Sequence, residues 1–170
     1  MIVVADASPL NYLVLIEQVH LLPSLYGTVL VPEVVHGELQ RPGAPEAVKT
    51  WAARPPEWLE VCVVQGSPDE PLSALDPGER DAILLALERG AEMVLIDEVE
   101  GRREAQRRNV RVAGTLAVLG QAARQGLVDL PVILRRLQQT NFRVSPKLIS
   151  QLLELASRPA AGNDRSTVNG

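Results

Sequence analysis

The chain has 170 residues, 46% of them hydrophobic, and a formal net charge of −4. This composition excludes an intrinsically disordered chain, and no apolar stretch approaches the roughly 18 residues that span a bilayer. Because the net charge is negative, the chain as a whole lacks the excess of basic residues that is typical of many nucleic-acid-binding proteins. We expect one globular domain in the cytoplasm, because the chain starts without the basic segment of a signal peptide and Cys62 is its only cysteine.

The apolar pattern alternates between the periods of strands and helices along most of the chain. Short β-branched runs predict strands at 1–6, 28–31, 59–64, 92–97 and 110–112. Longer runs, several of them begun by proline, predict helices at 8–18, 19–26, 32–40, 45–54, 77–89, 98–109 and 115–125. Residues 65–73 are expected to form a loop.

This alternation predicts a three-layer α/β/α domain with a central, mainly parallel sheet. Residues 130–157 carry only a helical pattern, so we expect a helical appendage that completes a single domain over residues 1–157. The last segment, 158–170, is polar and rich in small residues, and we expect it to be disordered.

The segment LSALDPGERDAILLALERG, residues 72–90, places three carboxylates at the start of an apolar helix. Asp76 followed by Pro77 is typical of a helix N-cap with proline at the first position. Glu79 occupies the third position, where an acid completes a capping box. Asp81 lies beyond the first turn, so neither the cap nor the helix dipole explains it. Residues two positions apart on a helix are rotated by about 200° about its axis, so Glu79 and Asp81 point to nearly opposite sides.

Four acids fall where an open parallel sheet binds ligands, at the carboxyl ends of strands or on helices beside them. Asp6 ends the first predicted strand, and Asp97 ends the strand at 92–97. Glu38 lies late in its helix, where an acid is not favoured, and Asp81 begins the helix that leads to the Asp97 strand. Clustered carboxylates repel one another, so the pattern predicts a bound hard cation, Mg²⁺ or Mn²⁺. Such an ion activates water and stabilises the charge of phosphodiester cleavage.

Other kinds of site lack their motifs in this sequence. GxxxxGK[ST], GxGxxG and CxxC are absent, and the two histidines, His20 and His36, are too few for a zinc site. We expect His36 to be a surface or packing residue and Cys62 to be a buried structural thiol. A receiver-type phosphoacceptor would need a second acid directly after Asp6 and a lysine after a late strand, and the sequence has neither.

Four segments, in this order and spacing, resemble the PIN-domain nucleases, the fold of the VapC-type toxin ribonucleases. The resemblance runs from residue 1 to about residue 155 and is closest to a PIN-like branch of predicted nucleic-acid-binding proteins. It rests on VVADASPLNYLVLIEQVHLL, VPEVVHGEL, LDPGERDAILLALERG and MVLIDEVEGRREAQRRNVRVAGTLAVL.

The resemblance implies an endoribonuclease that uses Mg²⁺ or Mn²⁺ and, as in many family members, a toxin role with a small antitoxin partner. Its metal-binding and catalytic acids would be Asp6, Glu38, Asp81 and Asp97. Ser8 would be the hydroxyl neighbour of the first acid. The resemblance favours Asp81 over Glu79 as the third acid, while helical periodicity leaves Glu79 open as a metal ligand. Leu95 is a departure, because many toxin members carry threonine or serine at that position.

Five of the fifteen arginines fall within ten residues: Arg102, Arg103, Arg107, Arg108 and Arg111. One interpretation is a solvated helix with Glu98–Arg102 and Glu104–Arg108 pairs one turn apart. The other is a basic rim beside the acids, in which the RNA-binding residues are Arg102, Arg103 and Arg107.

The main alternative to the nuclease is a non-catalytic PIN-like module that binds RNA or a protein. Only the nuclease would combine site-dependent Mn²⁺ binding with cleavage. The segments LPVILRRL and LISQLLELA carry more apolar surface than one domain can bury, which predicts a homodimer.

Overall fold

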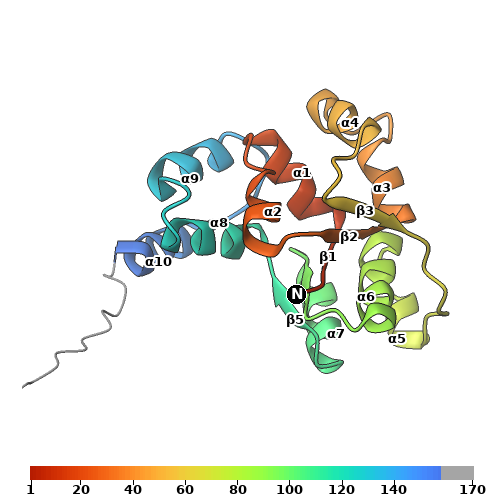
Figure 1. The fold of residues 1–170 in the computed structure, drawn as a ribbon. Helices are drawn as coiled ribbons and strands as arrows, with labels where there is room; N and C mark the ends of the chain where they lie inside the picture. The colour runs from red at the N-terminus through yellow and green to blue at the C-terminus, as the bar shows by residue number, and fades with distance from the viewer. Residues whose placement is uncertain (158–170) are drawn as a thin grey trace, which may run out of the picture.

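The structure is a computed structural model that describes residues 1–157 (Figure 1). In this part of the chain, five short strands form one sheet in which all neighbours run parallel. Their spatial order is β3-β2-β1-β4-β5. The strands are β1 (Val3–Ala5), β2 (Val29–Pro32), β3 (Leu59–Cys62), β4 (Met93–Leu95) and β5 (Arg111–Ala113). The predicted α/β/α fold with a parallel sheet is confirmed.

Helices fill the connections between the strands and form the end of the described chain. They are α1 (Ala7–Leu15), α2 (Leu21–Tyr26), α3 (Glu33–Leu39), α4 (Glu46–Ala53), α5 (Glu70–Ser73), α6 (Pro77–Arg89), α7 (Val99–Arg107), α8 (Thr115–Arg124), α9 (Leu130–Gln138) and α10 (Pro146–Ser157). None of the helices in residues 1–157 is both long enough and apolar enough to cross a membrane.

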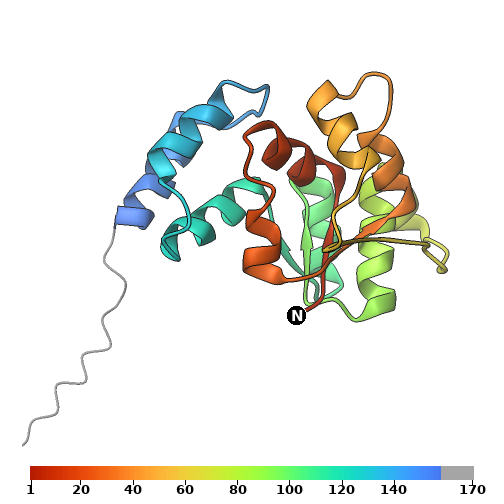
Figure 2. The same cartoon turned by 45° about the horizontal axis from the view of Figure 1, so that its top comes forward.

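Helices cover both faces of the sheet and give the domain its layers (Figures 1 and 2). Each face buries a separate apolar core. Val3 and Ala5 contribute to the core that α1, α2 and α8 cover, whereas Val4 contributes to the core beneath α6 and α7. All three side chains are fully buried. Parallel strands that are covered on both faces have continuous apolar sequences. The strands β1, β2 and β4 are buried throughout, which explains why the sequence predicted them well.

Two local predictions about the helices are wrong. Helix α1 begins at Ala7 and ends at Leu15, instead of extending from 8 to 18. It ends early because Glu17 takes a left-handed conformation with φ of 59°. The predicted loop at 65–73 contains the single turn α5, whose first turn is capped by the side chain of Asp69.

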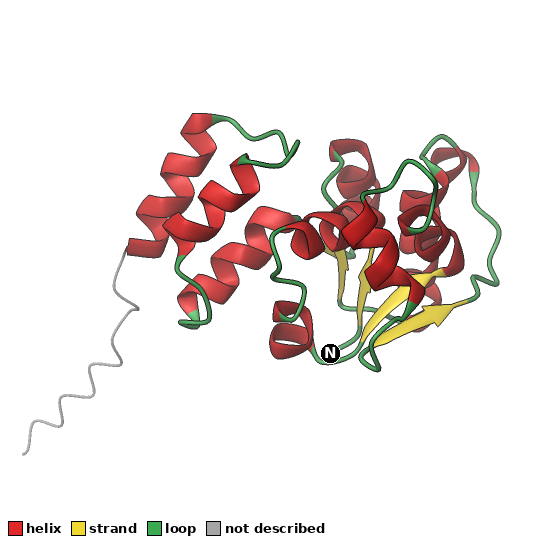
Figure 3. Cartoon of the chain, turned by 90° about the horizontal axis from the view of Figure 1, so that it is seen from above, coloured by secondary structure: helices red, strands yellow, loops and turns green. Residues whose placement is uncertain are grey.

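The C-terminal helices α8, α9 and α10 lie together at one end of the molecule (Figure 3). Leu134 and Leu137 of α9 are almost completely buried and join the core on the α1 face of the sheet. Ile149 of α10 is also buried there. The helical pattern of residues 130–157 therefore forms two helices packed on the α/β layers. The expected disorder of residues 158–170 concerns a segment outside the described residues.

Candidate active site

The carboxyl edge of the sheet has a topological switch point at β1, because β2 lies on one side of this strand and β4 on the other. Ligands of open α/β sheets bind at such a point, where successive connections leave to opposite faces. Asp6 directly follows β1, and its backbone N–H donates to the carbonyl oxygen of Leu95 at 2.9 Å. Asp97 follows β4 by two residues. The ends of two neighbouring strands thus place the first and last predicted acids at one edge.

A cleft of about 580 Å³, here called the acid cleft, opens at this edge. Five acids and Arg41 line it, and the acids are Asp6 after β1, Glu38 on α3, Asp76 and Glu79 at the start of α6, and Glu98 before α7. Gly78 lets the start of α6 approach Glu38 and Asp6 closely. A Cβ atom at Gly78 would lie 2.7 Å from Oε1 of Glu38 and 3.0 Å from Oδ1 of Asp6. A side chain at position 78 would therefore displace these two carboxylates from the positions that they hold in the structure.

Burial raises the pKa values of Asp6, Glu79 and Glu38 above those of ordinary carboxyl groups. Asp6 is 5% exposed, and burial raises its pKa from 3.8 to about 7, although the Ala7 backbone N–H opposes the shift. Glu79 is 7% exposed, and burial followed by the charge of Asp6 raises its pKa from 4.5 to about 7. Burial also raises the pKa of Glu38. Since both desolvation and like charge disfavour ionised carboxylates, the acid cleft favours the binding of protons or another cation.

Asp97 is held in one orientation by three hydrogen bonds. Its Oδ2 accepts from the hydroxyls of Ser8 and Thr115, each at 2.8 Å, and its Oδ1 accepts from the Thr115 backbone N–H at 2.7 Å. The predicted hydroxyl neighbour Ser8 thus contacts the last acid. Thr115 was not singled out from the sequence, where its only signal is its place at the start of a predicted helix. It is fully buried at the start of α8.

The structure does not bring Asp81 into the acid cleft. Its Oδ1 accepts from Nε of Arg80 at 2.8 Å, and Glu79 lines the cleft in its place. Asp81 is close enough to raise the pKa of Glu38, but burial, Arg41 and Asp76 all affect that pKa more strongly. The physical reason is the helical rotation between positions 79 and 81, which turns one acid toward the sheet edge and the other away.

The predicted capping box at the start of α6 does not form. Asp76 occupies the N-cap position, but its side chain makes no cap hydrogen bond. Glu79 is buried in the acid cleft and does not complete the box. The acid that local sequence rules assigned to helix capping therefore lies beside Asp6.

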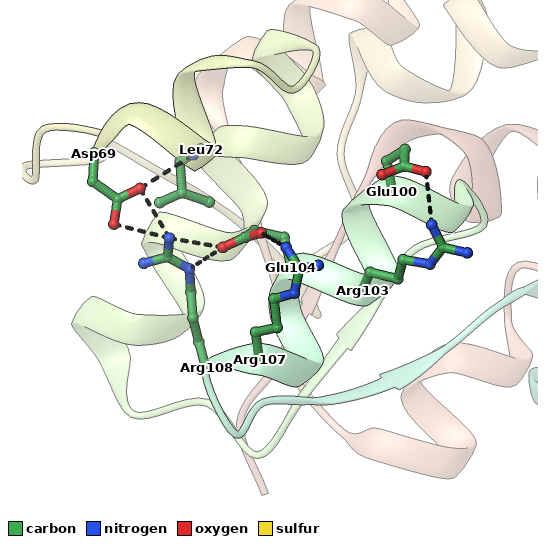
Figure 4. Close-up of polar contacts among 7 residues, drawn as sticks. All are labelled: Asp69, Leu72, Glu100, Arg103, Glu104, Arg107 and Arg108. Atoms are coloured by element: carbon green, nitrogen blue, oxygen red, sulfur yellow. Dashed lines mark hydrogen bonds and ion pairs between the residues drawn. The ribbon is translucent and has the colours of Figure 1, made fainter.

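Most of the clustered arginines belong to an ion-pair network around the buried Glu104 and the exposed Glu100 (Figure 4). Arg103 pairs with Glu100 at 3.2 Å, and Arg107 pairs with Glu104 at 3.3 Å. Arg108 bridges Glu104 and Asp69, joining the end of α7 to the start of α5. The solvated-helix interpretation thus describes these three arginines. The remaining predicted RNA-binding residue, Arg102, lies in a cleft beside Asp97. The expected Glu98–Arg102 pair is not among the ion pairs of residues 1–157.

The chemistry of the acid cleft fits a hard divalent cation, because its charged groups other than Arg41 are carboxylates, and neither cysteine nor histidine lines it. Asp6, Glu38 and Glu79 make no ion pair with any residue of the described chain. Within residues 1–157, however, no three acid, histidine or cysteine side chains already converge as a metal site. The acids would therefore have to move toward a common ion when it binds.

An acid-lined cleft at the switch point of a parallel sheet defines an α/β domain with a ligand site at its carboxyl edge. The family model DUF3368, described as a PIN domain, matches residues 2–158. The chain belongs to the PIN-domain family, and its fold is of the nuclease type. Comparisons of the chain with curated proteins and with solved structures gave no significant match.

Proposed function

We propose that this protein is an Mg²⁺- or Mn²⁺-dependent endoribonuclease that hydrolyses RNA phosphodiester bonds in the acid cleft. The observation that carries the proposal is that Asp6, Glu38 and Glu79, from three different elements, line one cleft. All three have raised pKa values and form no ion pair within residues 1–157, although Arg41 lines the cleft and opposes the rise at Glu38. Buried like charges of this kind are costly unless a cation neutralises them, so the arrangement is suited to function more than to stability.

The residues of the cleft have separate roles in this proposal. Asp6 and Glu79 would hold the metal directly, and Glu38 would bind it directly or through water and orient the nucleophile. Asp97 would face the same edge in the orientation that Ser8 and Thr115 fix. When bound, the metal would supply a water of lowered pKa and would offset the charge that develops on the phosphate. Glu79 takes the role that the family resemblance implied for Asp81.

The departure at Leu95 does not leave the last acid without polar contacts. Leu95 is fully buried in the core of the sheet. The hydroxyls of Ser8 and Thr115 supply the contacts to Asp97 instead. The absence of threonine or serine at position 95 is therefore compatible with an active nuclease.

Cleavage of single-stranded RNA in Mn²⁺ tests the proposal. Asp6→Asn keeps the size of the side chain but removes a charged oxygen, so we expect cleavage to fall at least ~100-fold. Glu57→Gln is a matched control, because Glu57 is exposed and outside the cleft. Equal cleavage by wild type and Asp6→Asn would refute the proposed nuclease activity of the acid cleft.

The second candidate function is a non-catalytic module that binds RNA or a protein. It is favoured by the lack of a preformed three-ligand metal site in the described residues. RNA binding without Mn²⁺-dependent cleavage would support it. A toxin role with a small antitoxin partner rests on the family resemblance, and a small partner gene beside this one would support it.

A further inference from the structure

A second cleft, of about 740 Å³, adjoins the acid cleft and is here called the arginine cleft. The two clefts share Ser8, Tyr12 and Glu98 in their walls. Asp97 lines the arginine cleft close to this shared wall. A chain-like ligand that crosses the acids can therefore continue into the arginine cleft.

The walls of the arginine cleft come from distant parts of the sequence. One wall is formed by α7 and the start of α8, and the other by the loop between α9 and α10. This loop is fixed to α1, toward which it extends (Figure 2). The hydroxyl of Tyr12 donates to Oδ1 of Asn141 at 2.9 Å, and the rings of Tyr12 and Phe142 pack edge to face with centroids 4.8 Å apart. The C-terminal appendage thus forms part of a cleft next to the candidate active site.

Two arginines give the cleft its positive charge. Arg102 comes from α7, and Arg143 comes from the loop between α9 and α10. The point that a Cβ atom on Gly114 would occupy is 3.8 Å from Nη1 of Arg102 and 2.7 Å from Oδ1 of Asp97. One guanidinium therefore lies beside the last acid. Neither arginine forms an ion pair with another residue in the described part of the chain. Guanidinium groups that form no ion pair are well suited to bind phosphate oxygens.

Apolar side chains complete the cleft around these charges. Leu116 of α8 and Leu148 and Leu152 of α10 line it together with the ring of Phe142. Leu148 is 45% exposed, so part of this surface is open to solvent. A nucleotide base needs such a surface, because every base has a flat face that packs on aromatic and apolar groups.

We propose that the arginine cleft binds the nucleotide next to the scissile phosphate of single-stranded RNA. Arg102 and Arg143 contact its phosphate from the two walls, and its base packs on Phe142 and the leucines of α8 and α10. This inference rests on the proposed nuclease, because it takes the adjoining acid cleft as the place of cleavage. RNA is favoured over a protein ligand because two guanidiniums that form no ion pair within residues 1–157 lie in a cleft adjoining the acids, which matches an evenly spaced polyanion.

Binding of a short, fluorescein-labelled single-stranded RNA of about eight nucleotides tests the inference by anisotropy in EDTA at several salt concentrations. Arg102→Gln and Arg143→Gln should each weaken binding about 5- to 10-fold. Each should also reduce the slope of log affinity against log salt by about 0.7, because one phosphate contact is lost. Arg89→Gln and Arg136→Gln are the matched controls, since these exposed arginines lie on α6 and α9 outside both clefts. All four side chains are at the surface, so the variants should fold.

In cleavage assays with Mn²⁺, Arg143→Gln should raise KM and leave kcat within about twofold of wild type. Equal affinities and salt slopes for the cleft variants and their controls would overturn the inference, and the cleft would then serve another ligand, such as an acidic protein segment. If wild type cleaves but the cleft variants behave like the controls, the inference fails and the nuclease stands. If nothing is cleaved but binding in EDTA depends on Arg102 and Arg143, the nuclease fails and RNA binding by the cleft stands.

Discussion

Glu79 and Asp81 lie two positions apart on α6 and have opposite surroundings. Glu79 is 7% exposed and lines the acid cleft with Asp6, whereas Asp81 is paired with Arg80 at 2.8 Å outside it. We expect Glu79→Gln to lower Mn²⁺-dependent cleavage at least ~100-fold, because it removes a charged ligand. Asp81→Asn should keep activity within about threefold, since it removes only a partly exposed ion pair. Loss of cleavage in Asp81→Asn with full activity in Glu79→Gln would reverse the assignment.

The periodicity of α6 explains why the sequence did not decide between these acids. A helix with one apolar stripe shows which side faces the sheet. In α6 all five consecutive residues from Ala82 to Ala86 are buried, so both the Glu79 side and the Asp81 side carry apolar neighbours. The rotation of the helix is set by its tertiary packing, which the local pattern does not contain.

The positions of two other acids could be predicted from the sequence, because the position of each depends on a single strand. Asp6 and Asp97 each follow an apolar strand, and parallel strands bring such positions to one edge. Thr115 and Arg143 could not be found in this way. Their roles depend on α8 and on the loop after α9, which reach the site only when the C-terminal helices pack.

Thr115 provides a test of how Asp97 is held. Thr115→Val removes the hydroxyl that donates to Asp97 but keeps the shape of the side chain and the backbone N–H contact. We expect a loss of about 1 kcal/mol in the free energy of unfolding and a fall in kcat of about 10-fold. Thr115→Ser keeps the hydroxyl and should be close to wild type in both measurements. Equal kcat values in Thr115→Val and Thr115→Ser would show that this hydrogen bond has no role in activity.

The raised pKa values predict how the stability of the metal-free protein depends on pH. The folded pKa values of Asp6 and Glu79 are both about 7, above their ordinary values of 3.8 and 4.5. The folded state therefore binds more protons than the unfolded state, and stability is lost as pH rises through about 7. In EDTA, the free energy of unfolding by urea should be more than ~1 kcal/mol lower at pH 8 than at pH 5.5.

Two additions to this pH experiment identify its cause. Asp6→Asn replaces an ionisable carboxyl with an amide. The unfolding free energy of this variant should therefore depend less on pH than that of wild type. Adding Mn²⁺ at pH 8 should stabilise wild type, because the ion binds the folded state. Greater stability of metal-free wild type at pH 8 than at pH 5.5 would contradict the effect assigned to the buried acids.

Self-association is expected from apolar side chains that the C-terminal helices expose. Val132 of α9 is 39% exposed and Leu155 of α10 is 53% exposed. Light scattering at concentrations on the order of tens of micromolar should give twice the monomer mass of 18.5 kDa. Leu155→Lys should shift the mass toward the monomer, and Lys147→Gln, an exposed change on the same helix, should not. A wild-type mass near 18.5 kDa would rule out the dimer.

The central claim is that the acid cleft is a divalent-metal site, and the anomalous scattering of a crystal soaked in Mn²⁺ tests it most directly. We expect one ion whose nearest ligands are carboxylate oxygens of Asp6 and Glu79 at about 2.0–2.3 Å, with Glu38 bound directly or through water. The same soak of Glu79→Gln should leave the site empty or weakly occupied. An ion bound by Asp81 and not by Glu79, or no ion in the acid cleft at saturating Mn²⁺, would contradict the claim.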